Sequence, residues 1–128
     1  MASILKVDTI TGVTTAGSIA ITGEGNSTTT NLQQGLAKAW HQSDNAAAQA
    51  DSLNVSGGTD NGTGDYTISF TNSMANNNFA PPHITAEDAN HVLHAHTRAT
   101  GSVRVNNVNE SAAARDASTA GTVHGDLA

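Results

Sequence analysis

The amino-acid sequence predicts an all-β fold, a small antiparallel β-sandwich-like domain with an extended N-terminal arm. Two observations indicate this fold, and a third bears on self-assembly. Short runs with alternating apolar residues recur, as in "DYTISF" and "SVRV", which is the period of a half-buried strand. Glycine and asparagine separate these runs, as turns require. Large apolar residues are scarce, because Ile, Leu, Val and Phe together supply 22 of 128 residues, about 17%, below the roughly 20% expected of a globular domain.

The shortage of large apolar side chains also predicts self-assembly. The net charge is only −6, whereas disordered chains usually combine low hydrophobicity with high net charge. A folded chain with so thin a core gains stability when neighbouring copies bury its faces. We therefore expect an obligate oligomer.

Composition argues against several classes of protein. The five basic residues are scattered (Lys6, Lys38, Arg98, Arg104 and Arg115), while nucleic-acid binding needs a clustered basic surface. The absence of cysteine removes disulfides, thiolate catalysis and cysteine-type zinc sites. The start "MASILKVD" lacks the features of a signal peptide, and no stretch is apolar for long enough to cross a bilayer. We expect neither nucleic-acid binding nor membrane insertion.

Residues 1–31 are expected to form the arm, for assembly or attachment, and residues 32–128 the small β-rich domain. The arm mixes β-branched residues with glycines, and two short runs, "TITG" and "AITG", end eleven residues apart at Gly12 and Gly23. Too little apolar surface lies there for an independent core. An extended strand that pairs with another chain fits this pattern, and a flexible linker is the alternative.

A short helix is predicted over residues 32–42, because Leu32, Leu36 and Trp40 are four apart. The alternative is that "AKAWHQ" extends as a strand, since Gly35 interrupts the helical pattern. Trp40 is the largest apolar group and is expected to anchor the core or a subunit contact. A stacking platform for sugar is the alternative for this side chain. Residues 43–51 are expected to be a loop.

The clearest signal is a β-hairpin over residues 52–71. Leu53 and Val55 are predicted to share one face of its first strand, and the alternating residues of "DYTISF" share one face of the second (Tyr66, Ile68 and Phe70). Between them "GGTDNGTG" is dense in turn residues, so the chain should turn at Asn61–Gly64.

The remaining elements are expected in order as follows. A loop over 71–84 should pack Met74 and Phe79 back onto the sheet, and the Pro81-Pro82 pair should mark an edge or a connection. Residues 86–99 are compatible with helix or strand. The later segments are predicted as a strand at 101–108, a loop at 109–119 and a terminal strand at 121–128. The topology of residues 41–50 and 80–100 stays open.

No enzyme chemistry is expected. From Asp60 the twelfth position of a calcium loop is Thr71 rather than glutamate, so an EF-hand is excluded. Asp60 and Asp65 are favoured in turns for backbone reasons alone, with a surface cation site or an acid/base pair as alternatives. The chain has no GxSxG motif, and "GEGNS" lacks the lysine of a phosphate loop. We assign no catalytic, cofactor-binding or metal residue, and no cofactor.

Three of the six histidines gather in "HVLHAH". His91 and His94 would share a face of a helix, and His94 and His96 a face of a strand. In a parallel homotrimer the His94-x-His96 step would offer six imidazoles around the axis, enough for a transition metal. Exposed or hydrogen-bonded imidazoles at an interface are the alternative.

Four stretches resemble tail-fibre-like structural proteins of marine and freshwater tailed bacteriophages: "MASILKVDTITG", "ITGEGNSTTTNLQQGLAKAW", "DSLNVSGGTDNGTGDYTISFTNSMANNNFA" and the terminal "HGDLA". They cover about two thirds of the chain and carry no catalytic residue. The resemblance implies a virion component, assembled in the host cytoplasm, with a β-structured body that forms an intertwined homotrimer.

The expected function is therefore that of a non-enzymatic virion protein, a tail-fibre or fibre-adaptor component that attaches to the particle through its N-terminal arm. Its expected partners are its own copies, other virion structural proteins and, in a fibre role, a host cell-surface glycan or receptor. Capsid decoration or a head fibre is the alternative. A carbohydrate-binding adhesin domain that uses Trp40, Tyr66 or the loops is a further one.

Overall fold

The computed structural model describes residues 5–12, 19–22, 29–85 and 90–128. The chain divides into two compact units, Met1–Gly35 and Leu36–Ala128. The boundary predicted from the sequence falls after residue 31. Each unit is described by itself below.

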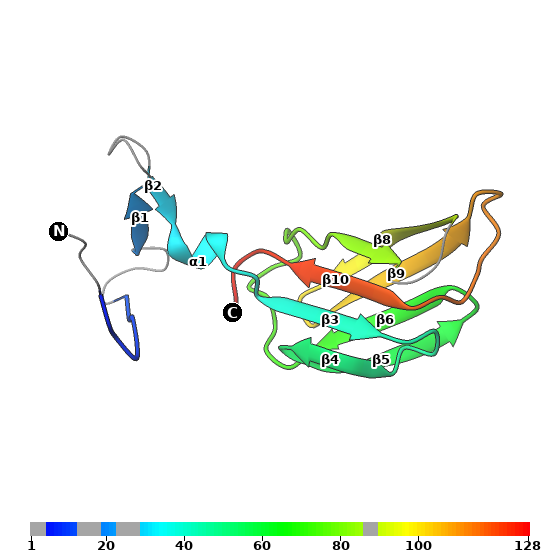
Figure 1. The fold of residues 1–128 in the computed structure, drawn as a ribbon, viewed down its shortest axis with the longest axis horizontal. Coiled ribbons are helices and arrows are strands. Elements are labelled where there is room, and N and C mark those ends of the chain that lie inside the picture. Colours follow the sequence, from blue (N-terminus) through cyan, green and yellow to red (C-terminus); the bar gives the residue numbers. More distant parts are fainter. Residues whose placement is uncertain (1–4, 13–18, 23–28, 86–89) are drawn as a thin grey trace. The chain divides into compact units, whose positions relative to one another are not determined.

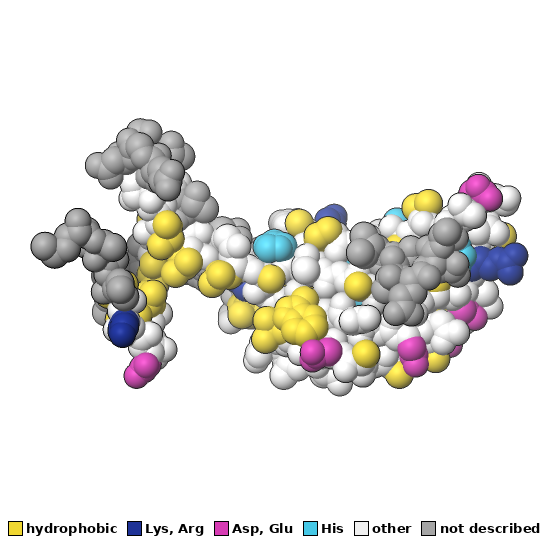
Figure 2. Space-filling model, in the orientation of Figure 1, with side chains coloured by type: hydrophobic (Ala, Val, Ile, Leu, Met, Phe, Trp, Pro, Cys, Tyr) yellow, Lys and Arg dark blue, Asp and Glu magenta, His cyan; other side chains and the backbone are white. Residues whose placement is uncertain are grey.

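The N-terminal unit contains one short antiparallel pair, β1 (Ala20–Thr22) with β2 (Thr29–Asn31), followed by the single helical turn α1 (Leu32–Gly35). The Leu32 amide donates a hydrogen bond to the Ile19 carbonyl, at 2.8 Å. Residues 5–12 have no regular structure and are exposed. No side chain that the structure describes in this unit is buried, and Figure 2 shows hydrophobic side chains at its surface.

The second unit is a β-sandwich of two four-stranded antiparallel sheets, which confirms the predicted all-β, sandwich-like character (Figure 1). The first sheet has the order β4-β3-β10-β7 and the second the order β5-β6-β9-β8. The bounds of the strands are β3 Ala39–Ser43, β4 Gln49–Leu53, β5 Val55–Gly62, β6 Asp65–Phe70, β7 His83–Thr85, β8 His91–Ala99, β9 Ser102–Asn109 and β10 Thr119–Val123.

The hydrophobic core lies between the two sheets. Strands β6 and β9 supply half of its buried residues, and these alternating residues are at most 7% exposed (Tyr66, Ile68, Phe70, Val103 and Val105). Met74 and Phe79 of the following loop are buried as predicted, and the Phe79 ring meets that of Phe70 edge-on, with centroids 5.8 Å apart. Ala39 and Val123 contribute from the first sheet.

The predicted hairpin is confirmed as β5 and β6. Strand β5 ends at Gly62, Thr63 and Gly64 form the turn, and both glycines have positive φ, +133° and +68°. Glycine adopts positive φ far more readily than residues that carry a Cβ. The Asp60 carboxylate accepts a hydrogen bond from the Gly62 amide, at 2.9 Å, which is the local bond that favours aspartate in turns.

The prediction that Leu53 shares an inner face with Val55 is wrong. Asn54 between them has φ +55°, so the alternation breaks and the chain passes from the first sheet to the second. Val55 packs against the core, while the Leu53 side chain is 49% exposed.

The helix predicted over residues 32–42 is also wrong beyond Gly35, because residues 39–43 form strand β3. The loop predicted over 43–51 is shorter than expected. The Asp44 carboxylate accepts hydrogen bonds from the Ala46 and Ala48 amides, both at 2.9 Å, and so holds a tight turn between β3 and β4. The open choice at 86–99 is decided for residues 91–99, which form strand β8, while residues 86–89 lie outside the described part. The terminal strand β10 begins and ends earlier than predicted.

Candidate functional site

The outer face of the first sheet carries Trp40, the one Trp, Tyr or Phe residue of the sandwich that is not buried. Strand β3 alternates, with Ala39, His41 and Ser43 buried and Trp40 and Gln42 facing outward. Of the two roles expected of Trp40, that of a core anchor is wrong, because its half-buried indole lies on the outside of the sheet. A subunit contact through this side chain stays a prediction. The i, i+4 spacing that suggested a helix was coincidental.

Strand register places neighbours on both sides of the indole. Trp40 lies opposite Leu53 of β4 and Thr122 of β10, and paired residues of antiparallel strands project on the same face. Gln42, two residues further along β3 and on the same face, lies opposite Asp51 of β4 and Ala120 of β10.

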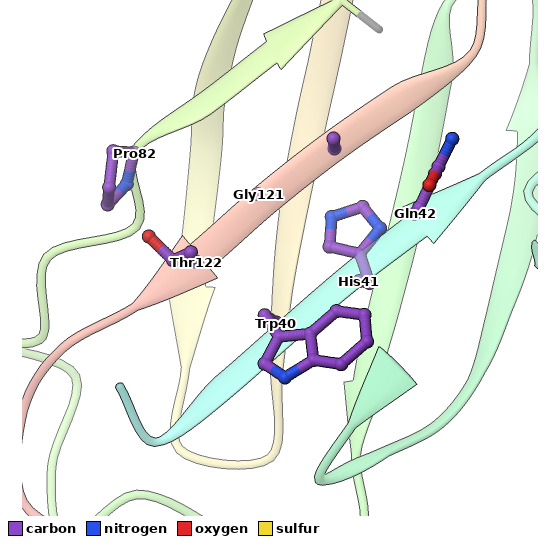
Figure 3. Close-up of a pocket in the computed structure, with 7 residues that line it drawn as sticks. Trp40, His41, Gln42, Pro82, Gly121 and Thr122 are labelled. Carbon is purple, nitrogen blue, oxygen red and sulfur yellow. The ribbon is translucent and has the colours of Figure 1, made fainter. Parts of the chain in front are cut away.

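A shallow open hollow lies over β3 and β10 (Figure 3). In the view the indole lies across β3 with its ring face outward; Thr122 of β10 lies to one side of it, and Pro82, just before β7, lies beyond Thr122. Among the residues that line the hollow, only His41 is titratable (Trp40, His41, Gln42, Pro82, Ala120, Gly121 and Thr122). An aromatic face beside amide and hydroxyl groups suits the binding of a flat, partly polar ligand or of another chain. It offers no acid/base pair.

Tyr66, the other aromatic residue considered for sugar binding, is completely buried. Its hydroxyl lies 3.1 Å from the Asn45 carbonyl and 3.2 Å from the Asp116 carboxylate, and it accepts a hydrogen bond from the Ala117 amide. Burial raises the pKa of this phenol to about 12. The alternative in which Tyr66 binds sugar is wrong, because these bonds fix it inside the sandwich, on the inner face that it was predicted to share with Ile68 and Phe70.

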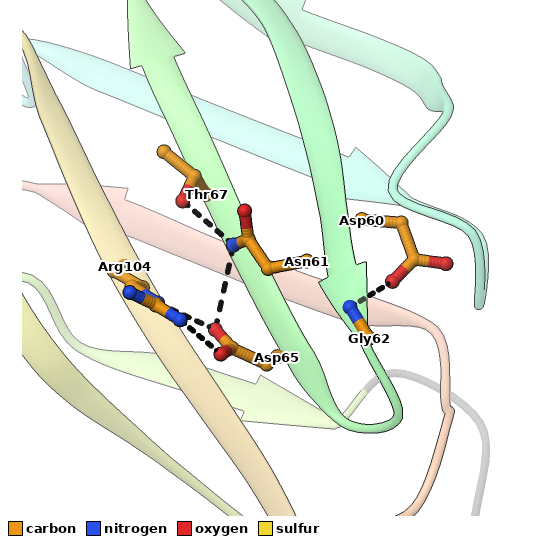
Figure 4. Close-up of polar contacts among 6 residues, drawn as sticks. All are labelled: Asp60, Asn61, Gly62, Asp65, Thr67 and Arg104. Carbon is orange, nitrogen blue, oxygen red and sulfur yellow. Dashed lines mark hydrogen bonds and ion pairs between the residues drawn. The ribbon is translucent and has the colours of Figure 1, made fainter.

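The carboxylates of "TDNGTGDY" each have a partner within the chain (Figure 4). Asp65 forms a two-point ion pair with the Arg104 guanidinium of β9, and Asn61 donates to Thr67 at 2.8 Å and to Asp65 at 3.4 Å. The hydrogen bond from Arg104 is the main reason that the pKa of Asp65 lies below its ordinary value. In this arrangement the two carboxylates serve the turn and the sheet.

The histidines of "HVLHAH" lie on the edge strand β8 rather than on a helix. His94 is exposed, opposite Asn106, which in turn lies opposite Asp65. The register shifts between Ala95 and Thr97, so His96 stands at a bulge and not in simple alternation with His94. His96 is nevertheless near enough to help lower the pKa of Asp65. The turn segment "TDNGTGDY" and the histidine segment "HVLHAH" thus lie close together on the outer face of the second sheet.

The described part of the chain contains no group of three or more histidine, aspartate or glutamate side chains placed to hold a metal ion. No helix within it is long and apolar enough to span a membrane. Compared with known proteins, the chain matches no family model, no curated protein and no solved structure.

Sequence reasoning missed one pairing of titratable groups. His41 of β3 and His83 of β7 flank Gly121 of β10 in one cross-strand row, and their rings pack together inside the sandwich. They are 42 positions apart in sequence and on strands that are not neighbours. No local pattern indicates such a contact.

Proposed function

We propose that the chain is a non-enzymatic structural protein of a tailed-bacteriophage particle, most simply a tail-fibre or fibre-adaptor component. It self-assembles as a homotrimer through its β-sandwich and attaches to the particle through its N-terminal unit. The resemblance of about two thirds of the sequence to such proteins supports this proposal. So does a sandwich whose accessible hollow offers no acid/base pair.

The observation that carries the proposal is the exposure of large apolar side chains in the N-terminal unit. Leu5 is 79% exposed, and Val7, Ile10 and Ile21 are each more than half exposed. Exposed apolar groups gathered in one region are typical of surfaces that another protein covers. An extended segment of this kind gains most when it adds as a strand to a neighbouring sheet.

Deleting residues 2–25 tests the attachment. Every buried hydrophobic residue of the sandwich lies at Ala39 or later, so the truncated chain is expected to remain folded and trimeric in solution while it fails to enter particles. Circular dichroism, sedimentation and the copy number in purified particles are the three measurements. Incorporation at the normal copy number would place the anchor elsewhere, and loss of the trimer would make the arm part of the assembly core.

The copy number of the intact chain separates the tail role from its alternative. Tens of copies or fewer per particle, localised by electron microscopy to the tail, are expected of a fibre or adaptor. Hundreds of copies on the shell would instead make the chain a capsid decoration or head-fibre protein.

Glycan binding is a second candidate function, and the outward Trp40 indole favours it. An aromatic ring face beside Gln42 and Thr122 matches the apolar face and the hydroxyl groups of a hexose. Trp40→Ala is then expected to abolish binding on a glycan array, while Leu53→Ala on the same face is expected to retain it. Equal binding by both variants, or none by the intact chain, would remove this candidate.

A further inference from the structure

Two histidines project into the interior of the sandwich from strands that are not adjacent. In the first sheet β10 lies between β3 and β7, and His41, Gly121 and His83 occupy equivalent positions on the three strands. His41 is 4% exposed, whereas His83, on the edge strand, is half-buried. The row therefore runs from the interior to the rim of the sheet.

Gly121 is what allows the two rings to meet. A side-chain carbon placed at Gly121 would collide with the His83 ring, coming within 2.6 Å of Nε2 and closer still to Cδ2. With no side chain there, the imidazoles lean over the middle strand until their centroids are 5.2 Å apart, tilted by 44°. The Nε2 edge of His83 lies over Gly121, the residue that separates it from His41.

A hydrogen bond sets the tautomer of His83. Its Nδ1 lies 2.9 Å from the Pro81 carbonyl oxygen. That oxygen can only accept, so Nδ1 carries the proton and Nε2 keeps its lone pair. The Nε2 atom is buried and has no hydrogen-bond partner. A backbone carbonyl that fixes one ring nitrogen in this way is the usual support of a histidine that binds a metal through the other.

His41 offers a second set of unused donor atoms. Its Nδ1 and Nε2 are both buried, and neither has a hydrogen-bond partner. A buried polar atom without a partner destabilises the folded chain, so native proteins rarely retain one without a reason. Burial, helped by the proximity of His83, lowers the pKa of His41 to about 4, and burial also lowers that of His83. Both rings are therefore neutral near pH 7, the form that binds metals.

We propose that His41 and His83 form a two-imidazole binding site for a divalent late first-row transition ion such as Zn²⁺ or Cu²⁺. A tetrahedral ion about 2.0–2.1 Å from one nitrogen of each imidazole separates the ring centroids by about 5 Å, close to the spacing observed here. Imidazole suits these ions, and Cu²⁺ is expected to bind most tightly of the series. Since no third ligating side chain is grouped with the pair in the described residues, water completes the coordination from the half-buried side of His83.

This site is distinct from the His94-x-His96 step considered in the sequence, because those side chains are exposed on the edge strand β8. It also does not depend on the proposed role in a virion. A metal across β3, β10 and β7 would link the interior of the first sheet to its edge.

The test uses the untagged full-length chain with CuCl₂, ZnCl₂ or NiCl₂ added separately. Calorimetry is expected to show one ion bound per chain. At ten times the dissociation constant, the midpoint of thermal unfolding is expected to rise by roughly 5–10 °C. His41→Gln and His83→Gln should each abolish both effects. The matched control, with His94→Gln and His96→Gln together, should keep them.

A measurement on the unaltered chain covers the case in which a variant fails to fold. Long-range ¹⁵N–¹H spectra resolve the ring nitrogens of all six histidines, and Zn²⁺ is expected to shift one nitrogen each of His41 and His83. The proposal is overturned if the chain binds no ion, if Zn²⁺ shifts only other histidines, or if His94→Gln with His96→Gln removes the binding.

Discussion

Gly64 occupies the most restricted backbone position of the β5–β6 hairpin. Its φ of +68° is one that side chains with a Cβ rarely adopt, and a Cβ there would collide with the Asn107 carbonyl and lie 2.9 Å from the Arg115 amide nitrogen. Gly62 also has positive φ, but its surroundings within 4 Å are open. A substitution at Gly62 therefore tests backbone strain alone, whereas one at Gly64 tests backbone strain together with steric collision.

Gly64→Val is expected to destabilise the chain by about 3 kcal/mol or more, because strain and collision act together. Gly62→Val should cost about 1–3 kcal/mol through strain alone. Gly57→Ala, on the same hairpin with open space and no positive φ, is the control and should change stability little. Urea denaturation gives the three free energies of unfolding. A Gly64→Val variant as stable as the control would show that the turn adopts another conformation.

His41 predicts a specific acid sensitivity. Its pKa is about 4 when folded and about 6.5 when unfolded, so the unfolded chain takes up a proton first as the pH falls. The folded chain therefore keeps its full stability above pH 6.5. Between pH 6.5 and pH 4 its free energy of unfolding falls by about 3 kcal/mol, because only the unfolded chain protonates His41 in this range. Urea denaturation of the metal-free protein at successive pH values measures this loss of stability. An NMR titration of the His41 ring should show a midpoint near 4. His41→Gln should flatten this pH dependence. A His41 ring that titrates near 6.5 in the folded chain contradicts the buried, unpartnered placement.

At the scale of elements, Asn54 connects the two sheets. Its Nδ2 donates to the Lys38 carbonyl at 3.0 Å and the Asn72 carbonyl at 3.1 Å, while its Oδ1 accepts from the Asn72 amide at 2.7 Å. The Asn54 carbonyl also accepts from the Thr71 amide. One residue with φ +55° thus joins the end of β4 to the segments that precede β3 and follow β6.

Asn54→Ala is expected to lower the free energy of unfolding by about 2–4 kcal/mol. It removes the side-chain hydrogen bonds and places alanine, which disfavours the left-handed conformation, at a position with φ +55°. Asn54→Gly loses the same bonds but tolerates the backbone, so it should be about 1 kcal/mol more stable than the alanine variant. Thermal and urea unfolding compare the two. Equal stabilities would mean that the left-handed backbone contributes nothing to the connection.

The elements that could be predicted from the sequence are those specified by neighbouring residues. The β5–β6 hairpin follows from alternation on both sides of a glycine-rich turn, and β9 from the same period in "SVRV". Strand β3 could be predicted only as an alternative to a helix, because the spacing of Leu36 and Trp40 imitates a helix; pairing with β10 and β4 decides for the strand. The hollow beside Trp40 and the pairing of His41 with His83 also depend on that register. Contacts between distant segments leave no period in the sequence.

At the scale of the whole molecule, the buried hydrophobic set is small and contains two alanines of β3 and its turn, Ala39 and Ala47. So little apolar burial hardly offsets the conformational entropy that a chain of 128 residues loses on folding. The full-length chain is therefore expected to sediment as a trimer across a wide concentration range, with no folded monomer. A compact, cooperatively unfolding monomer at low concentration would contradict the homotrimer.

Strand β10 lies between β3 and β7 at the centre of the first sheet, although it is the last strand in the chain. Until β10 is synthesised, β3 and β7 have no strand between them, and Gly121 is not yet in place between His41 and His83. The chain must then close contacts over some 80 residues, between β3 and β10, which slows folding. On the ribosome the β5–β6 hairpin can form early, but the sandwich must wait for residues 119–123 to emerge. A nascent chain paused before that point exposes two unpaired strand edges, and association with other chains competes with completion of its own sheet.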